Sequence, residues 1–87
     1  MRMNPNFELV EVANEYMLVP VGEASASFKG VVVLSEEAAY LLHQMEESMT
    51  EKDLLELLLK EYDVEPVVAR KDIEKFIEVA STLGFVI

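Results

Sequence analysis

The chain has 87 residues, is 52% hydrophobic and 28% charged, and carries a formal net charge of -10. So short a chain buries one core, so we expect a single domain over residues 1–87. The absence of cysteine excludes disulfides and thiolate metal sites, and the strong acidity disfavours nucleic acid and anionic membranes as partners. The N-terminus lacks the apolar core of a signal peptide, and no apolar run approaches a membrane span, so a cytoplasmic location is expected.

The first third of the chain predicts three antiparallel strands. Residues 7–12 and 16–21 are rich in β-branched and aromatic residues and flank "ANE", where Asn14 can adopt a positive φ, which indicates a hairpin. Pro20 has no N–H to donate, so it should lie where the second strand ends or faces solvent. The polar connector "GEASAS" (residues 22–27) leads into a third strand over residues 28–34.

The third strand, "FKGVVVL", is uncharged apart from one lysine and has two interpretations. Its alternation places Phe28, Gly30, Val32 and Leu34 on one face, and Lys29, Val31 and Val33 on the other. It is either a strand covered on both sides by helices, or an edge strand with open backbone groups, ready for an added peptide strand. An open edge can also pair with a second copy of the chain, so a homodimer through this strand is an alternative use of it.

The rest of the chain predicts three helices. Ser35 is a good N-cap for the first, and Thr50 with Asp53 nearly forms a capping box for the second. Pro66 suits the first position of the third helix, and Gly84 suits its end. The expected apolar faces are Ala38, Leu41, Leu42, Met45 and Met49; then Leu54, Leu55, Leu58, Leu59 and Tyr62; then Ala69, Ile73, Phe76, Ile77, Ala80 and Leu83. The fold class is therefore α+β: a three-stranded antiparallel sheet followed by three helices.

The sequence contains no recognisable catalytic or metal-binding set. His43 is the only histidine, and it lies beside the apolar stripe of the first helix as a structural or surface residue. The carboxylates follow no calcium-loop or HExxH spacing, and the three glycines form no phosphate-binding loop. We therefore expect a protein that is not an enzyme and that holds no metal or cofactor.

Three of the basic residues of the acidic half, Arg70, Lys71 and Lys75, lie at the front of the third helix. Helix-stabilising pairs such as Arg70 with Glu74 account for them in one interpretation. In the other, they form a local basic patch that reads an acidic residue of a ligand.

The order of these segments resembles the PqqD-like family, the peptide-recognition domains of ribosomally made, modified peptides. The resemblance is carried by "EYMLVPVGEAS…FKGVVVLSEEAAYLL", "MTEKDLLELLLKEYDV" and "ARKDIEKFIEVASTLGFV". It implies a winged-helix-like fold and a non-catalytic adaptor that binds the leader segment of a precursor peptide as an extra antiparallel strand. It also implies delivery of that precursor to a modifying enzyme, often a radical S-adenosylmethionine (SAM) protein.

The resemblance implies a peptide-binding groove between the third strand and the third helix. Its expected walls are Lys29, Gly30, Val31, Val32, Val33 and Leu34 on one side, and Arg70, Lys71, Asp72, Lys75, Phe76 and Val79 on the other. The segment "EESMT" stands where the family often has D-G-x-R-T, which favours an adaptor for a modified peptide other than pyrroloquinoline quinone. The alternative function is a winged-helix DNA-binding or transcription-associated domain, which the net charge of -10 opposes.

Overall fold

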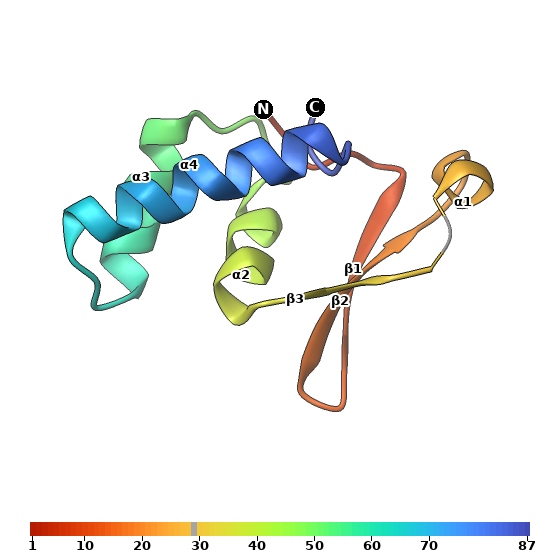
Figure 1. Cartoon of the computed structure of the whole chain (residues 1–87), viewed down its shortest axis with the longest axis horizontal. Helices are drawn as coiled ribbons and strands as arrows, with labels where there is room; N and C mark the ends of the chain where they lie inside the picture. The colour runs from red at the N-terminus through yellow and green to blue at the C-terminus, as the bar shows by residue number, and fades with distance from the viewer. Residues whose placement is uncertain (29) are drawn as a thin grey trace.

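The structure, a computed structural model, describes residues 1–28 and 30–87. Strands β1 (Phe7–Val12), β2 (Glu15–Pro20) and β3 (Val32–Leu34) form an antiparallel sheet of order β1-β2-β3. A short helix α1 (Ala24–Ser27) precedes β3, and α2 (Glu36–Gln44), α3 (Glu51–Glu61) and α4 (Pro66–Thr82) follow it (Figure 1). The predicted α+β, winged-helix-like arrangement is confirmed. The connector over residues 22–27 was predicted without α1, and the second strand was predicted one residue too far along the chain.

The β1–β2 hairpin closes through a two-residue turn. Val12 pairs with Glu15, and both Ala13 (φ 52°) and Asn14 (φ 66°) adopt left-handed backbone conformations. Two consecutive positive φ angles are typical of the type I′ turn, whose twist matches that of the flanking strands. The prediction identified Asn14 and missed Ala13.

Strand β3 is shorter than the predicted strand over residues 28–34. Continuing the register that pairs Val32 with Leu18 would place Gly30 opposite Pro20, which has no N–H to offer. Gly30 has a φ of +98°, which lies outside the β region, so the regular ladder does not include it. Phe28 anchors the approach to β3 instead, because its ring packs edge-to-face on Phe7 and Phe85 with centroids 5.6 and 5.9 Å away.

The starts of α2 and α3 follow the predicted caps. The Ser35 hydroxyl accepts a hydrogen bond from the Ala38 N–H at 3.1 Å. Thr50 and Asp53 form a full capping box, with the Asp53 N–H donating to the Thr50 hydroxyl at 3.1 Å and the Thr50 N–H donating to the Asp53 carboxylate at 3.0 Å. Helix α2 ends at Gln44, so the predicted stripe residue Met49 lies in the following loop, where it still packs against the core.

Helix α4 begins and ends as predicted, with Pro66 in its first turn and Gly84 (φ +80°) after its last residues. The Phe85 N–H donates to the Ala80 carbonyl at 2.8 Å, which is the long bond of a Schellman motif. This motif turns Phe85 and Val86 into the core, whereas Leu83, predicted to be buried, is 45% exposed.

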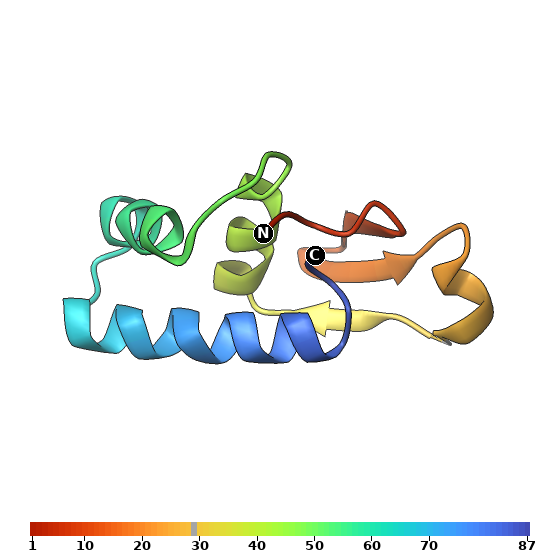
Figure 2. The ribbon, with the colours of Figure 1, turned by 90° about the horizontal axis from the view of Figure 1, so that it is seen from above.

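Helix α2 lies at the centre of the molecule, between the sheet and α3, and the long helix α4 runs alongside α3, α2 and β3 (Figure 2). The largest fully buried side chains come from β2, from the three long helices and from Met45, the residue that caps the end of α2. Besides Met45 they are Leu18, Leu41, Leu42, Leu54, Leu58 and Ile73. The two termini lie side by side, since Arg2 and Ile87 exchange backbone hydrogen bonds of 2.8 Å. Within residues 1–28 and 30–87, every helix is too short or too polar to cross a membrane. The expected cytoplasmic location stays a prediction.

Candidate functional site

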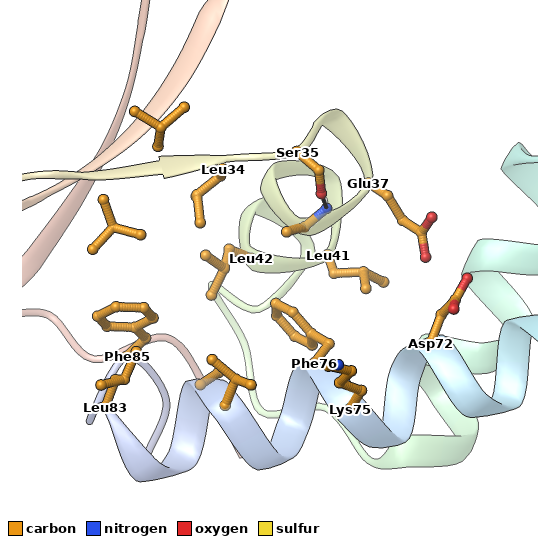
Figure 3. Close-up of a pocket in the computed structure, with 15 residues that line it drawn as sticks. Leu34, Ser35, Glu37, Leu41, Leu42, Asp72, Lys75, Phe76, Leu83 and Phe85 are labelled. Carbon is orange, nitrogen blue, oxygen red and sulfur yellow. Dashed lines mark hydrogen bonds between the residues drawn. The ribbon is translucent and has the colours of Figure 1, made fainter.

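A groove of about 470 Å³ runs between β3 and α4 (Figure 3). Residues 32–34 of β3 form one wall, and the side of α4 that carries Phe76 and Val79 forms the other. Leu41 and Leu42 of α2 form the floor; both are almost fully buried. The groove therefore combines an apolar floor with a strand on one side and a helix on the other.

The β3 wall is an open edge of the sheet, because β3 pairs only with β2 in the part of the chain that the structure describes. In an antiparallel ladder, residues alternately direct their N–H and C=O groups toward one neighbouring strand and the other. Val12 and Glu15 flank the two-residue turn and so form a hydrogen-bonded pair, which makes Tyr16 and Leu18 face β3.

The partners of Tyr16 and Leu18 are Leu34 and Val32, so these two residues of β3 direct their backbone groups toward β2. Val33 lies between them and therefore directs its N–H and C=O groups to the open edge. Its side chain is 62% exposed on the outer face of the sheet. Of the two interpretations of the third strand, the edge strand is the one that the structure shows.

The middle of the groove is apolar and its far end is charged. Leu34 from β3 and Phe76 from α4 point into the space between the two walls, and Phe85 lies at one end (Figure 3). At the other end, Glu37 of α2 and Asp72 of α4 point toward one another. Burial raises the pKa of the Glu37 carboxyl above its usual range, and the nearby Asp72 carboxylate adds to this rise. The groove thus ends in a pair of carboxyl groups that repel each other when both are ionised.

The structure brings together seven of the twelve predicted peptide-binding residues: Val32, Val33, Leu34, Asp72, Lys75, Phe76 and Val79. Gly30 and Val31 are exposed residues that precede β3, and neither lines the groove. Lys29 lies outside the described residues.

Arg70 and Lys71 line a separate depression at the start of α4, together with Glu74. Neither lines the groove, whose α4 wall begins at Asp72. Arg70 lies off the stripe of α4 residues that form this wall, whereas Lys71 lies one turn before Lys75, beyond the end of the groove. Of the three basic residues singled out in the sequence, only Lys75 contributes to the groove.

Sequence reasoning missed the contribution of α2. Glu37, Ala38, Leu41 and Leu42 line the groove, although three of them were predicted as ordinary core residues. The one signal that could have found them is their place in the sequence, in the helix that directly follows the edge strand.

His43 and the carboxylates were the other candidates for chemistry in the sequence. His43 is exposed on α2, which fits the surface alternative of its predicted role as a structural or surface residue. The described residues contain no group of three or more histidine, cysteine, aspartate or glutamate side chains that could hold a metal ion. The expected lack of a metal and a cofactor stays a prediction.

The family described as "Coenzyme PQQ synthesis protein D (PqqD)" matches residues 15–86. No curated protein matches the chain.

Two solved structures share the fold. "TbiB1 in Complex with the TbiA(beta) Leader Peptide" superposes with a TM-score of 0.76 at 13% identity, over 99% of this chain and 94% of that one. "Lasso peptide synthetase B1 complexed with the leader peptide" superposes with a TM-score of 0.74 at 19% identity, over 99% of this chain and 95% of that one. At such low identity these matches establish the fold.

Proposed function

The chain belongs to the PqqD family, and we propose that it is a non-catalytic adaptor that binds the leader segment of a ribosomally made precursor peptide. The observation that carries the proposal is the open edge of β3 beside an apolar groove. A strand edge supplies backbone pairing that accepts many sequences, and a groove beside it supplies side-chain selection. The same fold occurs in two proteins solved together with leader peptides, which supports the proposal.

In the proposed complex the leader lies antiparallel to β3 and becomes the fourth strand of the sheet. Val33 pairs with it, because the N–H and C=O groups of this residue point to the open edge. Alternate leader side chains then point toward Phe76 and Val79 in the groove, and the others point away from it. Lys75 lies at the rim, where it attracts an acidic leader residue.

We further propose that the whole chain acts as one unit and passes the bound precursor to a modifying enzyme, of the radical SAM class. "EESMT" (residues 46–50) in place of the family's D-G-x-R-T favours a modified peptide other than pyrroloquinoline quinone. In the absence of a leader, the open β3 edge can pair with a second copy of the chain, and a homodimer of this kind competes with leader binding. The DNA-binding alternative has no support, since the net charge is -10 and only Lys75 is basic among the residues of the groove.

Calorimetry with synthetic leader segments, taken from the short peptides encoded beside this gene, tests the proposal. One segment should bind with a stoichiometry of one, and a scrambled segment of the same composition should not. Val33→Pro removes the outward N–H and should weaken binding at least about tenfold. Val33→Ala removes the side chain and keeps the N–H, so it serves as the matched control and should bind nearly as well as the wild type. Equal affinity of the two variants would show that no peptide strand adds to β3.

A further inference from the structure

Helix α2 has a second face that lines a separate pocket. Glu36, Ala39, Tyr40 and His43 recur at i, i+3, i+4 and i+7, and they line a space of about 390 Å³ that β1, β2 and the end of α3 complete. Residues 37, 38, 41 and 42 of the same helix line the leader groove. The two cavities therefore lie on different sides of α2, and the proposed leader does not fill the second one.

The second pocket contains every tyrosine of the protein. Tyr16 lies in β2, Tyr40 lies in α2 and Tyr62 directly follows α3 as its C-cap; all three are half-buried. The rings of Tyr40 and Tyr62 pack edge-to-face with centroids 5.7 Å apart. Tyr40 and Tyr62 also pack against the hydrophobic core, so the core holds their rings in place at the cavity.

Three carboxylates surround the tyrosines. Glu11, Glu36 and Glu61 line the pocket and are exposed, and the described lining residues include no lysine or arginine. Burial is the largest cause that raises the pKa of the Tyr62 phenol. The nearby Glu36 and Glu61 carboxylates raise this pKa further. The pocket is thus aromatic, strongly negative and open to solvent.

We propose that this pocket binds a cationic side chain, arginine or lysine, of a partner protein. Aromatic rings attract cations through the negative potential of their faces, and carboxylates beside the rings add charge–charge attraction. Arginine fits better than lysine, because its planar guanidinium group stacks on a tyrosine ring while it donates to two carboxylate oxygens. A partner with a basic surface is also drawn toward a chain of net charge -10. If the proposed function holds, that partner is the modifying enzyme, but the pocket's preference for a cation does not depend on leader binding.

The protein offers a direct spectroscopic test, because it has no tryptophan and its three tyrosines all line this pocket. Tyrosine fluorescence and the ring resonances of the tyrosines can be followed while N-acetylarginine amide is added. N-acetylcitrulline amide has nearly the same shape without the charge and is the control ligand. We expect saturable changes with the arginine amide and none with the citrulline amide.

Two matched double variants distinguish binding at the pocket from attraction by the overall negative charge of the chain. Glu36→Gln with Glu61→Gln removes two charges at the pocket, and both residues are exposed, so the fold should survive. Glu46→Gln with Glu78→Gln removes two exposed charges elsewhere. The first pair should weaken binding of the arginine amide at least about fivefold, and the second pair should change it less than about twofold.

Three results would overturn the assignment. One is the absence of saturable tyrosine changes with the arginine amide, and another is an equal response to the citrulline amide. The third is an equal loss of affinity in both variant pairs, which would show attraction by net charge alone. The same titration is repeated with putrescine, a free diamine. Tighter binding of putrescine than of the arginine amide would identify a small-molecule site in place of a protein interface.

Discussion

Replacing Val32 or Val33 by proline tests which backbone groups of β3 are free. Val32 pairs with Leu18 and directs its N–H toward β2, whereas the N–H of Val33 points to the open edge. Proline removes the N–H and fixes φ near -65°, so it is tolerated in an edge strand only where the N–H faces outward. The two neighbouring substitutions should therefore have very different effects on stability.

The expected size of the difference follows from the groups that lose their partners. Val32→Pro removes one ladder hydrogen bond and leaves the carbonyl of the buried Leu18 unpaired, which costs about 1–3 kcal/mol. The proline ring crowds β2 as well, so the total loss in the free energy of unfolding should be about 3 kcal/mol or more. Val33→Pro breaks no ladder bond, and its side chain is 62% exposed, so the loss should stay below about 1.5 kcal/mol.

Urea denaturation followed by circular dichroism measures both changes, and Val32→Ala and Val33→Ala control for the lost side chains. The alanine values are subtracted from the proline values to isolate the backbone effect. Similar losses at the two positions, or a larger loss at Val33, would contradict the register and the assignment of the free edge groups.

Three further predictions concern the groove and the helices. Lys75→Glu should weaken binding of a leader with an acidic residue near its apolar anchor about fivefold in calorimetry, whereas Lys71→Glu, outside the groove, should change it little; equal losses would mean that only net charge matters. Thr50→Ala should lower the free energy of unfolding by about 1 kcal/mol and Thr50→Ser by much less, since serine keeps the cap; equal losses would argue against the capping bond. Because the pKa of Glu37 is raised in the folded state, its ionisation opposes folding, and the protein loses stability as the pH rises from the ordinary glutamate pKa through the raised one. Glu37→Gln should remove that loss in urea titrations at about pH 4 and about pH 7; an unchanged pH dependence would show that Glu37 is not its source.

The features that the sequence predicted well depend on local interactions. The caps at Ser35 and Thr50, the proline at the start of α4 and the glycine at its end all act within a few residues of the chain. The hairpin of β1 and β2 is local as well, since a two-residue turn joins its strands. The starts of these helices and the two strands of the hairpin lie within one or two residues of their predicted bounds, whereas α2 ends well before the predicted stripe residue Met49.

The length of β3 could not be predicted in this way, because it depends on residues far apart in the sequence. Its register against β2 decides that Gly30 would meet Pro20, and neither residue alone ends the strand. The burial of Phe85 in place of Leu83 has a similar cause, since it depends on the packing of Phe85 against Phe7 at the start of β1, with ring centroids 5.1 Å apart.

The candidate groove was predicted in part for the same reason. The α4 residues Asp72, Phe76 and Val79 and the β3 wall were identified, but the floor from α2 was not. A helix that packs on every side shows a wide apolar stripe, and periodicity alone does not say which neighbour each position meets. Helix α2 meets the groove with one part of its surface and the tyrosine pocket with another, and only the tertiary structure separates the two.

The short open edge of β3 also limits how a leader can bind. Val33 is the one residue of β3 that directs backbone groups outward, so it offers about two hydrogen bonds, worth about 1–3 kcal/mol in total. A micromolar complex requires about 8 kcal/mol, and association itself has a further entropic cost. At about 25 cal/mol per Å², the missing 5 kcal/mol or more corresponds to about 200 Å² of buried apolar surface, roughly one or two large side chains. A leader that binds here must therefore owe most of its affinity to apolar residues against Phe76 and Val79, and the strand edge must chiefly set its direction and register.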